Sequence, residues 1–311
     1  MRIAIIGSNS FIASYVIEEL HNRGHEVVGL QRHLDLEAKI PTPKFEADSI
    51  YIGDITNAEV VERVVSISDH VINLAGILGT SETVNNPLPA VEVNIKGTLN
   101  VLNACRVWEK PFLQIAVGNY WMNNTYSITR TTAERFTLMY AKEHGLKANV
   151  IRALNAYGAR QTFASYKKMM PGFILNALKN QPIKVYGDGQ QVMDFIHARD
   201  LAKFFVDTLL EPEKVQKEIS AITNIDLSGG LYGNVYQAGE GDGLPVQEIA
   251  KIVKRLCNSE SEIVNIPMRQ GEPEHARIVA DYKCPDYTIT LEEGIKETIE
   301  WYKANIDKYT V

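Results

Sequence analysis

The sequence has few of the features that mark secreted, membrane-spanning or metal-binding proteins. It holds three cysteines in 311 residues, Cys105, Cys257 and Cys284, too few and too far apart for a disulfide framework or a metal cluster. No apolar run approaches the ~20 residues that span a bilayer, and the N-terminus lacks the apolar core of a signal peptide. The seven histidines show no metal-ligand spacing. We therefore expect a cytoplasmic protein with no metal site and no membrane contact.

An excess of basic charge is also missing. The 32 Lys and Arg residues against 38 Asp and Glu residues give a net charge of −6 and a pI of about 5.7. A mildly acidic protein has no general attraction for nucleic acid, so we expect no nucleic-acid partner. The motif Gly-x-Ser-x-Gly is absent as well, which leaves an α/β-hydrolase interpretation without its nucleophile.

Short apolar runs alternate with amphipathic helical patterns over the first half of the chain. The runs that predict buried strands are residues 2–6, 25–30, 49–52, 70–75, 112–117 and 149–154, and the helical patterns lie near residues 11–23, 58–65, 90–108 and 126–144. This alternation predicts an α/β fold with a doubly wound parallel sheet, formed by residues 1–160.

The alternation fades after about residue 160. Helical patterns lie near residues 170–179, 200–210, 246–257 and 291–305, and short extended segments lie at 183–186 and 234–238. We expect residues 161–311 to form a smaller α/β lobe that shares a cleft with the sheet, with some strands and helices returning to the first domain. The polar stretch 211–233 is expected to be a solvated connection.

The turn after the first strand has the spacing of a phosphate-binding loop. Gly7, Ser10 and Ala13 follow the G-x-x-G-x-x-G pattern, with small side chains in place of two glycines. Such a loop lets the backbone and the following helix N-terminus approach a pyrophosphate. An ordinary strand–turn–helix is the alternative interpretation.

Two further positions bear on a nucleotide. Gln31 stands where a carboxylate would bind the ribose 2′-hydroxyl of NAD, and Arg32 follows it, which favours the 2′-phosphate of NADP. Asp54 follows the third strand, where it can accept a hydrogen bond from the adenine amine or serve ordinary turn chemistry.

These segments together resemble the extended short-chain dehydrogenase/reductase family of sugar-nucleotide epimerases and dehydratases. The segments that carry the resemblance are 7–13, 53–56, 72–76, 94–98, 152–160, 186–202 and 291–301, in the family's order along nearly the whole chain. The resemblance implies a Rossmann domain that binds NADP or NAD. The implied cofactor residues are Gly7, Ser10, Phe11, Ile12, Ala13, Arg32, Asp54, Ile55, Leu74, Ala75, Gly76, Asn94, Tyr126 and Arg130.

The resemblance also implies the catalytic pair. The family uses a tyrosine in Y-x-x-x-K to remove a proton from a sugar hydroxyl, and here the segment is Tyr126-Ser127-Ile128-Thr129-Arg130. Residues one helical turn apart share a face, so Tyr126 and Arg130 are expected to meet. Arginine supplies the cation that a phenol needs to act as a base, but it cannot relay a proton as lysine can.

The segment after the fifth strand departs from the family. Residues 116–121 read Ala-Val-Gly-Asn-Tyr-Trp, with neither the family's serine or threonine nor the Thr-Asp-Glu of its dehydratases. Asn119, Thr80 or Thr125 could supply a replacement hydrogen bond, and the sequence does not choose among them.

The substrate lobe combines matches and departures. Asn155 and Arg269 stand where the family binds a nucleotide diphosphate, whereas Met193 replaces the arginine that precedes Asp194. We expect Arg160 and His197 to be structural residues. A nucleotide sugar is the expected small-molecule partner.

Three functions compete. The first is an NAD(P)-dependent sugar-nucleotide epimerase, or a dehydratase, with Tyr126 as base. The second is an NADP-dependent carbonyl reductase. The third is a cofactor-binding sensor or scaffold without chemistry, suggested by the missing hydroxyl and by Arg130. A homodimer paired through the helices near 90–108 and 126–144 is also expected from the resemblance, although ordinary core burial explains their apolar faces equally well.

Overall fold

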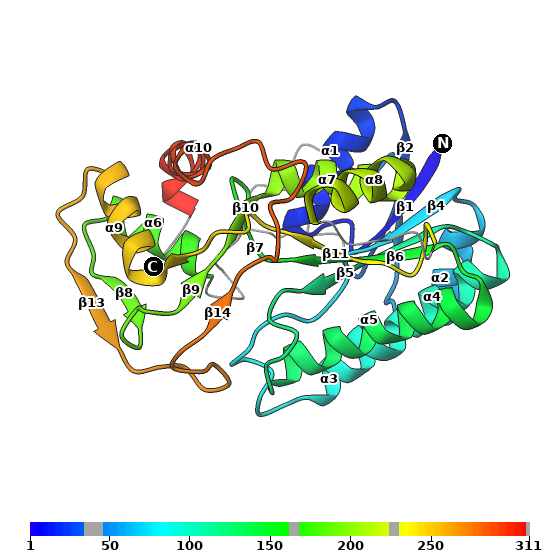
Figure 1. The fold of residues 1–311 in the computed structure, drawn as a ribbon, viewed down its shortest axis with the longest axis horizontal. Helices are drawn as coiled ribbons and strands as arrows, with labels where there is room; N and C mark the ends of the chain where they lie inside the picture. Colours follow the sequence, from blue (N-terminus) through cyan, green and yellow to red (C-terminus); the bar gives the residue numbers. More distant parts are fainter. Residues whose placement is uncertain (34–45, 162–167, 224–229, 309–311) are drawn as a thin grey trace.

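A seven-stranded parallel sheet lies at the centre of the larger lobe (Figure 1). The structure, a computed structural model, describes residues 1–33, 46–161, 168–223 and 230–308. The strands in spatial order are β11 (Val235–Ala238), β6 (Ala148–Ala153), β5 (Phe112–Val117), β4 (His70–Asn73), β1 (Arg2–Ile6), β2 (Glu26–Gln31) and β3 (Ser49–Ile52). This order confirms the predicted doubly wound sheet, because strands 3-2-1-4-5-6 are the order of a dinucleotide-binding fold and β11 extends it by one strand.

Helices cover both faces of the sheet (Figure 1). The helices on one face are α1 (Phe11–Asn22), α7 (Ala198–Leu210) and α8 (Pro212–Thr223), and those on the other are α2 (Ala58–Ser66), α4 (Thr98–Val107) and α5 (Thr125–His144). Each layer buries its own apolar cluster against the sheet, so the strands read as continuous apolar runs rather than as alternating patterns.

The chain order reverses between β1 and β4. Ile6, the last residue of β1, pairs with Leu30 of β2 on one side and with Asn73 of β4 on the other. The turns that follow β1 and β4 therefore leave the same edge of the sheet side by side. In open parallel sheets such a switch point is where ligands bind.

The helix predicted near residues 90–108 consists of three segments. A short α-helical segment, α3 (Leu88–Ala90), runs into a π-helical segment, η1 (Val91–Gly97), which continues as α4. A π-helical segment inserts an extra residue per turn and often marks a functional site. Here it carries Asn94.

The smaller lobe packs three helices on short strands. The helices are α6 (Met169–Leu178), α9 (Val246–Leu256) and α10 (Leu291–Ala304), followed by the 3-10 helix η2 (Ile306–Lys308). The strand pairs are β7 (Asn155–Tyr157) with β10 (Phe195–His197) and β8 (Ile183–Tyr186) with β13 (Ile263–Ile266), and a third sheet joins β12 (Leu244–Pro245), β9 (Val192–Met193) and β14 (Arg277–Ile278). Helix α10 begins with a capping box between Thr290 and Glu293, which satisfies two of its free N–H groups.

The prediction of a solvated connection over residues 211–233 was wrong for its first half. Residues Pro212–Thr223 form α8, whose Val215 and Ile219 are buried against the α7 face of the sheet. These two residues are four apart and supply the apolar stripe of a helix whose other positions are mostly polar. Residues 224–229 lie outside the described part of the chain.

Candidate functional site

The turn between β1 and α1 has the shape of an anion site. Gly7 has a φ of +87°, and any side chain there would come within 2.8 Å of the backbone nitrogen of Ala75. Ser10 caps α1, since its hydroxyl accepts a hydrogen bond from the Ala13 N–H at 3.4 Å, and the first turn of the helix holds no acidic residue. The N-terminal end of α1 therefore presents a positive partial charge that no side chain of its first turn neutralises, as a bound pyrophosphate requires.

Phe11 and Ile12, the first two residues of α1, attach this turn to the protein core. Both are partly buried and pack against the core between α1 and the sheet. The ring centroids of Phe11 and Tyr15 lie 5.7 Å apart in an edge-to-face arrangement. They hold the start of α1 in place.

The end of β2 carries no carboxylate. The Ser8 hydroxyl donates to Gln31 Oε1 at 3.0 Å, which fixes the Gln31 amide beside the first turn. Arg32 follows it with an exposed side chain. The only formal charge at residues 31 and 32 is therefore positive.

Asp54 lies in the turn after β3. Its Oδ1 accepts hydrogen bonds from the N–H and the hydroxyl of Thr56, at 2.9 and 2.8 Å. Burial opposes ionisation, but these bonds outweigh it, and the pKa of Asp54 lies below its ordinary value. Ile55 is buried next to Gly97, where a side chain would collide with it. The turn thus presents a fixed carboxylate at the same edge of the sheet as Gly7.

The turn after β4 meets an arginine of α5. The Leu74 N–H donates to Ile6 O at 2.9 Å, which seats the turn beside β1. The Arg130 Nη1 donates to Ala75 O at 2.8 Å, and a side chain on Gly76 would come within 2.6 Å of the same nitrogen. Arg130 is 2% exposed, so its guanidinium is held against the turn at the switch point.

Asn94 of η1 fixes the next residue of this loop. Its Oδ1 accepts from the Ile77 N–H at 2.8 Å, and its Nδ2 donates to Ile77 O at 3.1 Å and to the Thr129 hydroxyl at 3.0 Å. The Asn94 side chain is fully buried and its amide is used within the protein. It holds the loop after β4 against α5, and a direct contact of Asn94 with a cofactor stays a prediction.

Tyr126 and Arg130 lie one turn apart on α5, and their side chains interact. Burial raises the pKa of the Tyr126 phenol above its ordinary value, and the Arg130 cation offsets part of that rise. Within the described residues, the buried Nε of Arg130 has no hydrogen-bond partner. The site therefore holds a phenol, a fixed cation beside it and an N–H group free to bind another molecule.

Apolar side chains surround Gly118 in the turn after β5, where the resemblance led us to expect a serine or threonine. A side chain on Gly118 would collide with the tip of Leu154 and come within 3.3 Å of Ile278. The space is filled from the other side by apolar groups. Asn119, the next residue, has its Nδ2 within 3.5 Å of Met122 Sδ, which is a weak acceptor.

The other two candidates for the hydroxyl role differ in what they contact. The Thr80 hydroxyl donates to Glu272 Oε1 at 2.5 Å and is committed to the smaller lobe. Thr125 is the first residue of α5, partly buried, one position before Tyr126. The Thr80 hydroxyl is thus already engaged, and the roles of Asn119 and Thr125 stay predictions.

The substrate side contains one cation that the sequence did not reveal. Arg269 pairs with Glu272 at 2.5 Å and lies over the Tyr186 ring, 4.8 Å from its centroid. Lys168, the residue before α6, lies near Arg269 and Glu272. Burial lowers the pKa of Lys168. The Glu82 carboxylate offsets part of that decrease, and the Arg269 cation adds to it. Lys168 and Arg269 therefore place two cations near each other in the smaller lobe.

Asn155 joins the two small sheets. Its Nδ2 donates to Asp194 O at 2.7 Å and approaches Met193 Sδ at 3.9 Å. Asp194 is fully buried and accepts from the backbone N–H groups of Ala280, Glu240 and Gly241. Asn155 is therefore engaged with the backbone in this structure, and its contact with substrate stays a prediction.

Arg160 and His197 have structural surroundings. Arg160 pairs with Glu18 at 2.6 Å and stacks on the Tyr15 ring at 4.2 Å. His197 is fully buried and caps α7 by accepting from the Arg199 N–H. Both tie the smaller lobe to α1 and α7.

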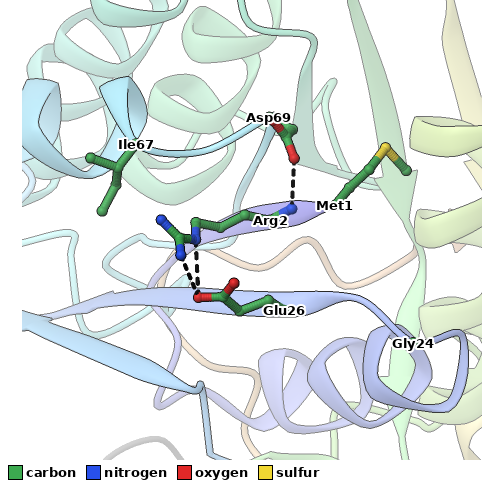
Figure 2. A pocket seen from close by; sticks show the side chains of 6 residues that line it. All are labelled: Met1, Arg2, Gly24, Glu26, Ile67 and Asp69. Atoms are coloured by element: carbon green, nitrogen blue, oxygen red, sulfur yellow. Dashed lines mark hydrogen bonds and ion pairs between the residues drawn. The ribbon is translucent and has the colours of Figure 1, made fainter.

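A surface pocket at the opposite edge of the sheet does not share these features. Figure 2 shows its lining residues, Met1, Arg2, Gly24, Glu26, Ile67 and Asp69. The Arg2 guanidinium pairs with Glu26 at 2.9 Å, and the Arg2 backbone N–H donates to Asp69 at 2.7 Å. Its one guanidinium is paired with Glu26, its Asp69 carboxylate is bonded to a backbone N–H, and it lies at the amino ends of the strands.

The described residues contain neither a metal-binding cluster nor a membrane-spanning helix. In residues 1–33, 46–161, 168–223 and 230–308, no group of three or more His, Cys, Asp or Glu side chains has the arrangement of a metal site. Over the same ranges no helix has the length and apolarity needed to cross a bilayer.

Comparisons with known proteins agree with this geometry. A family model described as "NAD dependent epimerase/dehydratase family" matches residues 3–116 and 113–225. The chain is 28% identical to the UDP-N-acetyl-alpha-D-glucosaminuronate decarboxylase of Bacillus cytotoxicus, over 97% of this chain and 98% of that protein.

Solved structures show the same fold. The UDP-glucose 4-epimerase of Thermotoga maritima, solved with UDP-glucose, is 23% identical, with a TM-score of 0.84 over 98% of this chain and 100% of that one. The UDP-glucose 4-epimerase of Thermus thermophilus, solved with NAD, is 23% identical, with a TM-score of 0.80 over 97% of this chain and 99% of that one.

Proposed function

This chain belongs to the NAD-dependent epimerase/dehydratase family, and from that premise we propose that it epimerises a UDP-linked sugar with Tyr126 as the base. It is an enzyme of the extended short-chain dehydrogenase/reductase type. The observation that carries the proposal is the pair of Tyr126 and Arg130 on α5, held beside the Ala75–Gly76 turn. A phenol next to a fixed cation can take up and return a proton.

The residues present fit a nicotinamide dinucleotide. Gly7 and the N-terminus of α1 would hold the pyrophosphate, Asp54 the adenine, and the unpartnered Nε of Arg130 a ribose hydroxyl. A bound nicotinamide would supply a reversible hydride acceptor for a sugar carbon. Its positive charge would also favour the ionised form of Tyr126, which burial alone disfavours.

The chemistry of Arg130 favours a redox-neutral reaction. Tyr126 removes the proton of a sugar hydroxyl and returns a proton to the same oxygen, so an epimerase needs no proton from solvent. A net reductase draws one proton from solvent in each turnover, and Arg130 cannot relay it because its guanidinium does not deprotonate. Elimination of water is also disfavoured, because no Asp or Glu lies between Gly118 and Tyr126.

The 2′ position of the cofactor separates NADP from NAD. Gln31 places no negative charge there, and the exposed Arg32 adds a positive one. NADP is therefore expected to bind at least as tightly as NAD. Arg32→Ala should weaken NADP binding and leave NAD binding unchanged, measured by titration of the two cofactors.

The two parts of the chain divide the work. We assign cofactor binding to residues 1–160 and substrate binding to residues 161–311, with α7 and β11 returning to the central sheet. Lys168 and Arg269 are proposed to hold the diphosphate. Asn119 or Thr125 would hydrogen-bond the reacting hydroxyl in place of the absent serine.

A second candidate reaction begins at the same step. The 28% identical relative is named as a decarboxylase of a UDP-linked uronic acid. Removal of a hydride from the hydroxyl-bearing carbon next to the carbon that carries the carboxylate would give a β-keto acid, which loses carbon dioxide. The enolate left behind would take up a proton from solvent on carbon, and return of the hydride would leave the cofactor unchanged overall, with Tyr126 in the same role.

Substrate conversion distinguishes these functions. Purified protein is expected to carry a bound nicotinamide cofactor and to convert one of a panel of UDP-hexoses into its epimer without consuming added cofactor. Stoichiometric consumption of NADPH would identify a reductase, and release of carbon dioxide from a UDP-uronic acid would identify the decarboxylase.

The variant Tyr126→Phe tests the proposed role of Tyr126 in the same conversion assay. It should retain the cofactor and lose about 10²- to 10⁴-fold in kcat, the usual contribution of a general base. Unchanged turnover in this variant would exclude Tyr126 as the base. A wild-type protein that binds cofactor but converts no sugar would support the sensor.

We also propose a cytoplasmic homodimer. Cys105, Cys257 and Cys284 are free thiols, as in a reducing compartment. Leu88 of α3 and Ile128 of α5 are 70% and 51% exposed. Apolar side chains of this size on the two helical segments favour pairing of protomers there. Sedimentation of wild type and of a Leu88→Asp, Ile128→Asp double variant would test this, with a monomer expected for the variant.

A further inference from the structure

Asn124 contacts both lobes through its two amide atoms. It lies two positions before Tyr126 and caps α5, because its Oδ1 accepts a hydrogen bond from the Ser127 N–H at 2.9 Å. Its Nδ2 donates to the carbonyl oxygen of Gly271 at 3.1 Å. The residue is 4% exposed, so both bonds are sheltered from water. One side chain therefore connects the helix that carries the phenol with a loop of the smaller lobe.

That loop, residues 269–272, begins with Arg269 and is seated closely on the larger lobe. Gly271 has a φ of +81°, and a side chain there would come within 2.9 Å of the carbonyl oxygen of Thr80. The Ser81 hydroxyl donates to the carbonyl oxygen of Gln270 at 2.7 Å. The path from Arg269 to Tyr126 thus runs through Gln270 and Gly271 of the loop, one hydrogen bond, the cap residue Asn124 and the first residue of α5.

We propose that Asn124 is a positioning residue that transmits the placement of the 269–272 loop to Tyr126. A diphosphate held by Arg269 sets the position of Gly271, and Asn124 then holds the first turn of α5 in register with it. This inference rests on the proposed function, since it requires Arg269 to bind the diphosphate. It predicts that the bond from Asn124 to Gly271 matters for turnover rather than for substrate binding.

Two substitutions separate the cap from the tether. Serine and aspartate cap helices about as well as asparagine, so Asn124→Ser and Asn124→Asp keep the acceptor for Ser127. Neither has an amide N–H to donate to Gly271, and aspartate places an oxygen against that carbonyl. Asn124→Asp also adds a charge near Tyr126, so Asn124→Ser is the principal variant.

The chain offers two matched controls. Asn57 caps α2 by accepting from the N–H groups of Glu59 and Val60, so Asn57→Ser reproduces the change of cap away from the 269–272 loop. Ser81→Ala removes another hydrogen bond to the same loop without touching α5. Both are expected to keep the kcat of the wild type.

We expect Asn124→Ser to lower kcat about 10- to 100-fold, as small displacements of a catalytic group do. The KM for the UDP-sugar should change less than about twofold and the melting temperature less than about 2 °C. An unchanged kcat, or an equal loss in Ser81→Ala, would overturn the proposal.

A second measurement does not depend on turnover. Saturation with UDP should slow hydrogen exchange of the Ser127 and Ile128 amides in the wild type and leave it unchanged in Asn124→Ser. Equal slowing in both proteins would overturn the role of Asn124. A wild type that binds UDP but converts no sugar would overturn the proposed function and leave this exchange result to decide the role of Asn124.

Discussion

The turns after β1 and after β5 leave the same edge of the sheet but are built in different ways. At Gly7 the chain adopts a left-handed conformation, and the space where a side chain would lie is taken by the backbone of Ala75. At Gly118 the corresponding space is taken by the side chains of Leu154 and Ile278. The first turn depends on backbone geometry, so it tolerates Ser10 and Ala13 in place of glycines. The second depends on side chains, and its chemistry has changed while the fold has not.

The largest effect is expected at the cation beside the phenol. Arg130→Met removes the charge that lowers the pKa of Tyr126, and burial then raises this pKa without opposition. Because the ionised phenol is the proposed base, the rise of kcat with pH should move to higher pH, and kcat near neutrality should fall at least ~100-fold. A kcat–pH profile measures this. Arg130→Lys, which keeps a cation, is the control, and an unshifted profile in Arg130→Met would contradict the role of Arg130.

Two glycines with positive φ separate backbone strain from loss of the anion site. Gly7→Ala strains the chain and collides with Ala75, whereas Gly24→Ala strains it at a φ of +75° with nothing within 4 Å. Each left-handed alanine costs about 1–2 kcal/mol, measured by denaturant unfolding. Gly7→Ala should cost more and weaken cofactor binding over tenfold (roughly 1.4 kcal/mol). Equal cofactor affinities in the two variants would contradict the assignment of the first turn.

Lys168 extends the comparison to the smaller lobe. Burial lowers the pKa of Lys168, and UDP is proposed to bind its charged form, so UDP affinity should begin to fall with rising pH below the ordinary lysine value of about 10.4. Lys168→Met should weaken UDP binding about tenfold, as loss of a charge-assisted hydrogen bond does, and remove this pH dependence. Lys184→Met, at an exposed position of β8, is the control for calorimetry at several pH values. If Lys168→Met keeps the alkaline loss of affinity, another group is responsible.

The smallest effect is expected where the hydroxyl is missing. Gly118→Ser forces the tip of Leu154 to move, which should cost about 1–3 kcal/mol of stability, and Leu154→Ala in the same chain should remove that cost. With room for it, the new hydroxyl is expected to raise kcat a few-fold. A double-mutant cycle of unfolding free energies and kcat measures both. Additive effects would show that Leu154 does not fill the place of the lost side chain.

The strands could be predicted from the sequence far better than the helical details. The ends of β1, β3, β5 and β8 match the predicted segments residue for residue. In β1 and β5 nearly every residue is buried, so the apolar run is uninterrupted. Helix α8 was missed because only Val215 and Ile219 mark its buried face in a polar segment. The π-helical form of η1 could not be predicted. Asn94 of this segment makes two hydrogen bonds to the backbone of Ile77, and local sequence does not encode such a contact.

The candidate site divides in the same way. Positions fixed by spacing along one element, such as Tyr126 and Arg130, could be paired from the sequence, since residues one helical turn apart meet. Lys168 could not, because Arg269 and Glu82 lie about a hundred positions away along the chain and meet it only through the fold. The lysine pair Lys167-Lys168 directly before the apolar run of α6 was the one signal available.

The last strand of the sheet has a consequence for synthesis. Strand β11 pairs with β6, and α7 packs against α1. The sheet and the helical layer that contains α1 are therefore complete only when β11 and α7 have been made. A ribosome that has released only the first 160 residues would expose an unpaired sheet edge and the uncovered face of α1. The amino-terminal half would have to wait for about 80 further residues, roughly 4–16 s of translation, and is the part most in need of a chaperone.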